Sequence, residues 1–187
     1  MQAAELNQLM DLHEEGYIDL CFADGSHFSL VPNVRKTWHL PNEDILLPST
    51  RSTPISVFGI MSLDCQLFSS MTEGTLNAEK IIEVVDDFAE TICKQTVVVI
   101  DNASMHHSKA FKEKVKEWKE KDLYIYYLPP YSPELNIIEM LWRCIKYQWI
   151  ELDAYTNLKI FKERLMYVLN NVGNLYRIDF AKRFELY

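Results

Sequence analysis

Three acidic residues stand where strand-like hydrophobic runs end, and this placement makes them candidates for chemistry. Asp24 ends the run at residues 17–23, and Asp101 follows the continuous apolar run at residues 97–100. Glu139 comes after the next such run along the chain, beyond a proline-rich stretch. In open α/β sheets, ligands and catalytic groups gather beyond the carboxyl ends of the strands. Because hard divalent cations prefer oxygen ligands, the three acids together suit a site for Mg²⁺ or Mn²⁺.

Structural explanations also exist for two of these acids when each is considered alone. Asp24 precedes Gly25, and Asp-Gly favours the tight turn of a β-hairpin leading into a second strand at residues 27–31. The spacing from Asn136 to Glu139 is that of a capping box, in which the glutamate returns a hydrogen bond to the start of its helix. The chemical hypothesis therefore depends on all three acids meeting at one place.

The elements that must position the acids follow from the hydrophobic periodicity. Alternation with a period of two, or a short continuous apolar run such as residues 97–100, predicts strands, and stripes with spacings of three and four predict helices. The predicted strands cover residues 17–23, 27–31, 55–61, 66–71, 97–100 and 123–128. The predicted helices cover a lead-in segment at residues 1–15 and then residues 77–93, 108–121, 132–149 and, within a C-terminal helical segment at 151–187, residues 158–172.

Some of these segments allow more than one use. The lysines of the helix at residues 108–121 alternate with glutamates, which favours a solvated face with ion pairs along the helix over a DNA-binding face. The stripe of the last helix favours packing on the sheet over a dimer seam. In the loop at residues 32–53, Trp38 lies beside Arg35 and Lys36. It is either an anchor packed on the core, which we favour, or a surface aromatic near DNA.

The length and composition limit the classes of protein to which the chain can belong. A length of 187 residues and a hydrophobic content of 48% fit one globular domain spanning residues 1–187. The four cysteines are widely spaced and lack a Cys-x-x-Cys pair, which favours reduced, buried thiols over disulfides or zinc. No run of eighteen apolar residues and no signal-peptide pattern occurs, so we expect a cytoplasmic protein without a membrane partner.

The charge balance disfavours nucleic acid as a partner, but its distribution weakens that conclusion. The net charge is −8, yet all 19 Lys and Arg residues lie after residue 24. The first 24 residues carry only acids: Glu5, Asp11, Glu14, Glu15, Asp19 and Asp24. The rest of the chain is therefore close to neutral, and phosphate binding depends on local potential more than on total charge.

The order of the elements is that of an RNase H-like fold, so we expect an α/β protein with a mixed five-stranded sheet flanked by helices. In that order Asp24 lies on the central first strand, Asp101 ends a parallel neighbour, and a helix brings Glu139 across the top. Bare carboxylates this close would repel, and two Mg²⁺ ions roughly 3.5–4 Å apart would relieve the repulsion. Such a pair of ions activates a water or a 3′-hydroxyl, so the expected chemistry is phosphodiester hydrolysis or transesterification.

At these residues the chain resembles a known family. Asp-Asn-Ala at residues 101–103 with His106 is similar to the second catalytic motif of DDE transposases. Leu-Pro-Pro-Tyr-Ser-Pro-Glu-Leu-Asn at residues 128–136 with Glu139 is similar to the third. The branch is the mariner-like superfamily, which includes many bacterial insertion-sequence transposases, and the likeness extends over about residues 17–150.

The resemblance implies a metal-dependent DNA endonuclease that cuts transposon ends and joins them to target DNA. Carried over position by position, it makes Asp24, Asp101 and Glu139 the catalytic and metal-binding residues, with two Mg²⁺ or Mn²⁺ ions as cofactors. It implies double-stranded DNA as the partner and a homodimer or other assembly on that DNA. It also implies supporting or DNA-binding roles for Asn102, His106, Asn136, Trp38, Arg35 and Lys36.

The chain departs from the family pattern at several points. Gly25 stands where the family usually has a glutamate, and Ile137 stands where it usually has a proline. The residues before Asp24 are too few for the helix-turn-helix modules that read transposon ends. We therefore expect a catalytic fragment, one reading frame of a split transposase with a separate recognition domain, or a derivative that has lost its own end recognition. The alternative function is a non-catalytic or domesticated domain that binds DNA or protein. The expected location is the cytoplasm, at the nucleoid of a bacterium.

Overall fold

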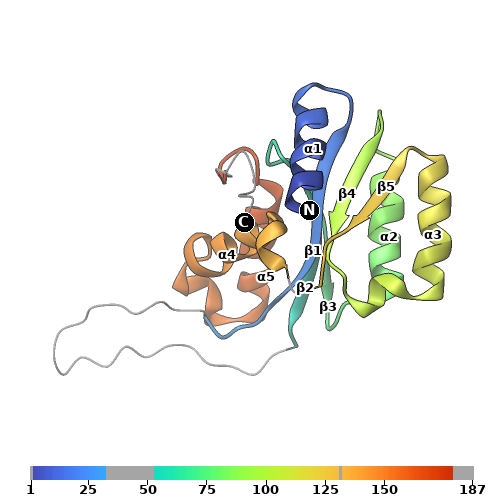
Figure 1. The fold of residues 1–187 in the computed structure, drawn as a ribbon. Coiled ribbons are helices and arrows are strands. Elements are labelled where there is room, and N and C mark those ends of the chain that lie inside the picture. Colours follow the sequence, from blue (N-terminus) through green and yellow to red (C-terminus); the bar gives the residue numbers. More distant parts are fainter. Residues whose placement is uncertain (1, 33–52, 131, 179–187) are drawn as a thin grey trace.

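One mixed sheet forms the centre of the molecule. The structure, a computed structural model, describes residues 2–32, 53–130 and 132–178. The five strands found there are β1 (Asp19–Phe28), β2 (Ile55–Ser62), β3 (Leu67–Glu73), β4 (Thr96–Ile100) and β5 (Leu123–Tyr127). Their order is β3-β2-β1-β4-β5, with β1 antiparallel to β2 and parallel to β4. The predicted five-stranded mixed sheet is confirmed, and β1 lies at its centre (Figure 1).

The predicted hairpin at Asp24 and Gly25 is wrong. β1 runs straight through both residues and pairs with β2 along this length, with Asp24 opposite Gly59. This pairing satisfies the backbone groups that a turn would have to satisfy in another way. Gly25 does not have the positive φ of a tight turn, but a Cβ at this position would lie 2.5 Å from Leu76 Cδ1. The glycine therefore serves close packing.

Helices cover both faces of the sheet. On one face lie α2 (Ala78–Ala89) and α3 (Lys109–Glu120), and on the other lie α1 (Gln2–Glu14), α4 (Ile138–Cys144) and α5 (Leu158–Asn170) (Figure 1). Side chains of β1 alternate between two hydrophobic cores: Leu20 and Phe22 enter one, and Cys21 and Ala23 enter the other. Burial on both faces explains the uninterrupted apolar sequence of β4.

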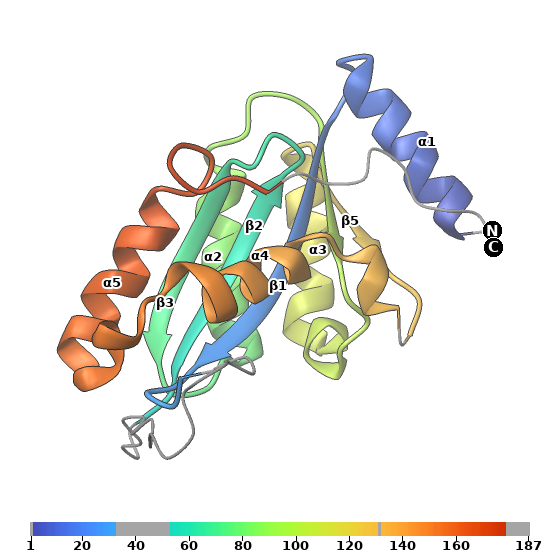
Figure 2. The same cartoon turned by 90° about the vertical axis from the view of Figure 1, so that its left-hand side faces the viewer.

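Short helical turns connect the larger elements. They are η1 (Ser104–His107), η2 (Pro133–Leu135), the π-helical η3 (Ile145–Trp149) and η4 (Leu152–Thr156). The helix predicted at residues 132–149 is therefore divided into a 3₁₀ turn, an α-helix and a π-helix. Figure 2 looks onto this face and shows α4 lying across the middle of the sheet.

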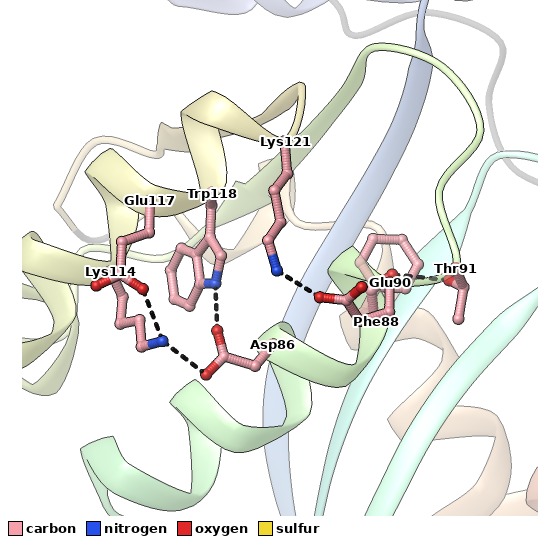
Figure 3. A network of polar contacts seen from close by, with 8 residues as sticks. All are labelled: Asp86, Phe88, Glu90, Thr91, Lys114, Glu117, Trp118 and Lys121. Atoms are coloured by element: carbon pink, nitrogen blue, oxygen red, sulfur yellow. Dashed lines mark hydrogen bonds and ion pairs between the residues drawn. The ribbon is translucent and has the colours of Figure 1, made fainter.

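The lysine-rich helix α3 is held to α2 by polar contacts (Figure 3). The indole Nε1 of Trp118 donates to Asp86 Oδ1 at 2.7 Å, and Lys114 Nζ lies 3.1 Å from Asp86 Oδ2. Lys121, directly after α3, pairs with Glu90, directly after α2. The predicted ion pairing along the helix is confirmed by Lys109–Glu113 at 3.9 Å and Lys114–Glu117 at 2.8 Å. The pairs with Asp86 and Glu90 were not predicted and join the two helical segments.

The last helix uses its apolar stripe as predicted. Phe161, Leu165 and Val168 on α5 are buried in the core that also holds the side chains of α4. The stripe therefore covers the sheet.

All four cysteines are free thiols, as predicted. Cys21 and Cys65 are buried and Cys144 is partly buried, but Cys93 is exposed because it lies in the connection after α2. The prediction of burial is therefore wrong for Cys93. Across the described ranges, none of the helices is long and apolar enough to cross a membrane.

Candidate active site

The side chains of Asp24 and Asp101 lie close together, where β4 ends beside the middle of β1. β1 and β4 run parallel, and Ala23 of β1 lies beside Ile100 of β4. Asp24 follows Ala23 in β1, and Asp101 follows Ile100 directly after β4. Both acids line a cavity of about 140 Å³. The parallel register is thus the reason why residues far apart in sequence come together.

Glu139 approaches from the helical layer. It lies in the first turn of α4 and lines a second cavity of about 350 Å³, together with Asp101 and Asn136. Asp101 and Ala103 contribute to the walls of both cavities. The three predicted acids therefore line neighbouring spaces at the carboxyl end of β4 and beside the middle of β1. The carboxyl ends of parallel strands are where sites in such sheets form.

The capping-box interpretation of Glu139 is wrong. Asn136, only 3% exposed, does not cap α4; its Nδ2 donates to the carbonyl oxygen of Ala23 at 3.1 Å. The residue at the N-cap is Ile137, which makes no side-chain cap bond. Asn136 Oδ1 is buried and has no hydrogen-bond partner among the described residues. The asparagine ties the segment before Glu139 to β1 instead of capping the helix.

His106 is the histidine that contacts Asp101. Its Nε2 lies 3.1 Å from Asp101 Oδ1, which also accepts a hydrogen bond from the Ala103 amide at 3.2 Å. The bond from His106 is the main cause of a lowered pKa for Asp101. The ring is 4% exposed and packs at an angle against Phe111, 5.2 Å between centroids. This buried setting fixes the ring beside the carboxylate.

His107 has different surroundings. Its ring stacks on Tyr127 at 5.1 Å between centroids, and its Nε2 contacts the side-chain oxygen of Asn102. Asn102 lines the larger cavity. His106 therefore fixes the side chain of Asp101, and His107 fixes that of Asn102.

The raised pKa of Asp24 is the clearest electrostatic indication of a functional site. Burial raises the pKa of Asp24 to about 7, and the charges of Glu139 and, less strongly, Asp101 add to the increase. Hydrogen bonds from the Gly25 backbone and from Trp142 lower the pKa but do not cancel the effect. The ion pairs formed among the described residues do not include Asp24. The negative charge at this point is thus incompletely compensated.

Lys146 on η3 is a residue of the site that the sequence reasoning missed. The charges of Glu139 and Asp24 act on its ammonium, and burial lowers its pKa. Its Nζ lies 5.3 Å from the centre of the Phe28 ring. The spacing of seven residues from Glu139, close to two helical turns, is the sequence signal that could have found it.

The donor set suits a hard divalent cation by its chemistry. Three carboxylates line neighbouring cavities, and a cation there would offset both the burial of Asp24 and the repulsion from Glu139 and Asp101, which together raise the pKa of Asp24. As the side chains stand, the described residues hold no ready-made group of three His, Cys, Asp or Glu ligands. One reason is that Asp24 Oδ2 is bonded to Trp142 and Asp101 Oδ1 to His106. The residue types and their location therefore fit a divalent cation, but the carboxylate oxygens do not point to one common position.

The predicted supporting residues divide into two groups. Asn102, His106 and Asn136 lie around the acids, as described above. Arg35, Lys36 and Trp38 fall outside the described residues. The interpretation of Trp38 as a core anchor or a surface aromatic therefore stays a prediction.

Comparison with solved structures identifies the fold. The chain is similar to the Mos1 transposase in its paired-end complex with the left transposon end: TM-score 0.65, 12% identity, 90% of this chain and 53% of that chain. The Mos1 mariner paired-end complex with Mn gives a TM-score of 0.60 at 12% identity, covering 90% and 53%. The catalytic core domain of BIV integrase gives 0.53 at 12% identity, covering 86% of each chain. This chain therefore has the RNase H-like fold of transposase and integrase cores and spans about half the length of the transposase chains.

Sequence comparison supplies the family. No curated protein matches the chain. A family model described as DDE superfamily endonuclease matches residues 19–162, which include Asp24, Asp101 and Glu139. Because this match covers most of the sequence, the chain belongs to the DDE superfamily of endonucleases.

Proposed function

We propose that this chain is the catalytic domain of a mariner-like DDE transposase of the bacterial insertion-sequence type. It would cleave DNA at transposon ends and transfer the cut strands to target DNA. The observation that carries the proposal is the gathering of three acids around neighbouring cavities, where Asp24 is largely buried and under the influence of Glu139 and Asp101. Structural acids elsewhere in the chain, such as Asp86, are paired with a base.

Asp24, Asp101 and Glu139 would hold two Mg²⁺ or Mn²⁺ ions. When bound, these ions supply Lewis acidity: they lower the pKa of an attacking water or 3′-hydroxyl and stabilise the leaving oxygen of the phosphodiester. No side chain acts as a covalent nucleophile in this proposal. The proposal is supported by the carboxylate donors around the neighbouring cavities and by the Mn named for the similar transposase complex.

The neighbouring side chains have separate tasks. His106, buried and bonded to Asp101 at 3.1 Å, orients that carboxylate and keeps it ionised. Asn136 holds the segment before Glu139 against β1 through the Ala23 carbonyl. The ammonium of Lys146 offers a positive charge beside the acids, which suits a phosphate group of the substrate.

The proposed substrate is double-stranded DNA, bound by an assembly of more than one copy of the chain. The similar structures include a transposase bound to a transposon end and a strand transfer complex. In this chain the basic residues all lie after residue 24, so the net charge of −8 does not describe the body of the domain.

A second candidate is a non-catalytic domain that keeps the fold to bind DNA or protein. The observation that favours it is the engagement of two of the carboxylates, Asp24 with Trp142 and Asp101 with His106. A domain of that kind would have no need for the bound ions. Measuring metal-dependent cleavage separates the two candidates.

The test is a strand-nicking assay with the whole chain, Mg²⁺ or Mn²⁺, and supercoiled DNA carrying the terminal repeats of the element. We expect nicked product with the wild type and a loss of at least about a thousand-fold with Asp24→Ala, because several kcal/mol of charge stabilisation disappear. Asp86→Asn is the matched control, since Asp86 lies on α2 away from the three acids, and it should cleave like the wild type. Equal rates for Asp24→Ala and the wild type would refute the proposal.

A further inference from the structure

We infer that Trp142 is a positioning residue that clamps the helix carrying Glu139 onto the carboxylate of Asp24, and that Gly59 provides the space for this clamp. The catalytic meaning of the inference rests on the proposed function. The mechanical part does not, because it concerns how α4 is held on β1. Trp142 is absent from the set of residues that the sequence motifs single out.

The clamp is a hydrogen bond between distant parts of the chain. Trp142 Nε1 donates to Asp24 Oδ2 at 3.0 Å, and the tryptophan is 2% exposed. Glu139 and Trp142 are three residues apart, so they lie one turn apart on α4. A movement of α4 away from β1 would therefore carry Glu139 away from Asp24 and break this bond at the same time.

Gly59 forms the seat of the indole. It is the direct partner of Asp24 in the β1–β2 register. A Cβ at residue 59 would lie 2.8 Å from Trp142 Cη2 and 3.2 Å from Cζ2, so the ring lies directly over the bare backbone. Phe28 packs edge-on against the same ring, with centroids 6.2 Å apart and an interplanar angle of 79°. Any side chain at residue 59 would displace the indole.

A second hydrogen bond holds the same segment on the other side of Glu139. Asn136 Nδ2 donates to the carbonyl oxygen of Ala23 at 3.1 Å. Residues 136 and 142 are thus bonded to consecutive residues of β1, with Glu139 midway between them. Two bonds to one strand fix both the position and the rotation of this part of α4.

The hydrogen bond from Trp142 opposes a repulsion that arises within the site. Two carboxylates brought together repel, and the repulsion acts to move α4 off the sheet whenever no cation lies between them. A buried donor to Asp24 opposes this movement and favours the ionised form of the carboxylate. The indole is well suited because it also fills the space above Gly59.

The first experiment needs no metal. Hydrogen exchange of the metal-free protein is compared for the wild type, Trp142→Phe and Trp118→Phe. Trp118→Phe is the matched control, since it removes an indole bond to an aspartate, Asp86, at another place. We expect the amides at residues 139–144 to exchange at least about tenfold faster in Trp142→Phe and unchanged in Trp118→Phe. Unchanged exchange of that segment in Trp142→Phe would overturn the clamp.

The second experiment connects the clamp to the ions. Mn²⁺ is titrated while the melting temperature is followed, and the midpoint concentration is compared between variants. Loss of a residue that orients a metal ligand typically weakens binding about 10- to 100-fold, so Trp142→Phe should raise the Mn²⁺ midpoint by at least about tenfold, and Trp118→Phe should not. An identical midpoint in both variants contradicts a positioning role.

Gly59→Ala provides a second test of the clamp in case Trp142→Phe does not fold. This variant keeps the indole N–H but forces the ring from its seat, so it should produce the same two effects. If the wild type shows no Mn²⁺ response at all, the proposed function fails, and the exchange measurement alone decides whether the clamp exists. Unchanged hydrogen exchange at residues 139–144 in Gly59→Ala would contradict the role of Gly59 in placing the indole.

Discussion

The molecule contains two tryptophan–aspartate pairs that look alike and differ in what surrounds them. Trp118 Nε1 donates to Asp86 at 2.7 Å between α3 and α2, and Trp142 Nε1 donates to Asp24 at 3.0 Å between α4 and β1. In both, a fully buried indole joins two elements through one hydrogen bond. Each pair therefore stabilises packing.

The charges around the two aspartates are opposite. Asp86 has the ammonium of Lys114 at 3.1 Å, which neutralises it within the α2–α3 contact. Asp24 has Glu139 and Asp101 nearby instead, and its pKa is raised to about 7. The two aspartates thus differ in their surroundings: a lysine is paired with Asp86, whereas burial and two other acids act on Asp24. The following predictions test this difference.

Removing the Trp118 side chain should have the largest effect on stability. Trp118→Ala leaves a cavity between α2 and α3 and an aspartate without its donor, so we expect a loss of about 3–5 kcal/mol in the free energy of unfolding. Denaturant titration measures it. Mn²⁺ binding by the folded fraction should stay unchanged, and a changed Mn²⁺ midpoint would mean that the two pairs are not independent.

Asp24→Asn should stabilise the metal-free protein at high pH. The folded pKa of about 7 exceeds the ordinary value of 3.8, so the folded state binds the extra proton. The contribution of Asp24 to stability is therefore most favourable below pH 4 and falls as pH rises to about 7. The loss is at most about 4 kcal/mol, and solvent at this partly exposed side chain reduces it.

Urea titrations of wild type and Asp24→Asn at several pH values check this prediction. The asparagine oxygen can still accept the bond from Trp142, so packing is kept. We expect the variant to be the more stable protein at pH 8 and the difference to disappear near pH 4. A variant that is less stable at pH 8 would show that burial and neighbouring charges do not penalise the ionised Asp24 carboxylate.

Mn²⁺ should stabilise the wild type, and its removal with EDTA should reverse the effect. An ion at about 100 times its dissociation constant adds roughly 2.7 kcal/mol, which raises the melting temperature by several degrees. Asp101→Asn should largely remove the increase, whereas Asp86→Asn should keep it. Equal increases in the two variants would place any bound Mn²⁺ elsewhere.

The ion pair between Lys121 and Glu90 should matter least. Both side chains are largely exposed, so solvent and salt screen their attraction. Lys121→Met should change the denaturation midpoint only slightly, and 0.5 M NaCl should remove the change. A clear, salt-resistant loss of stability would show that the α2–α3 contact depends on its exposed pairs as well as on Trp118.

Much of the fold follows from local sequence patterns, and the errors have identifiable causes. The apolar run of β4 and the stripes of α2, α3 and α5 predict elements that the structure confirms, because periodicity records which side faces the core. Asp24-Gly25 is a strong turn signal, yet the pairing of β1 with β2 overrides it. The Asn136–Glu139 spacing is overridden in the same way, by the bond from Asn136 to Ala23.

The sequence by itself determined the family motifs, the three acids and the elements that carry them, because these depend on residue types and short spacings. Only the tertiary structure decided that Asp24 lies within reach of Glu139, that Lys146 stands beside both, and that Trp142 bonds to Asp24 above Gly59. The contacts of Asp24 join segments separated by more than a hundred residues. Pairing between strands and the packing of a helix across them create such contacts, and no local pattern in the chain records them.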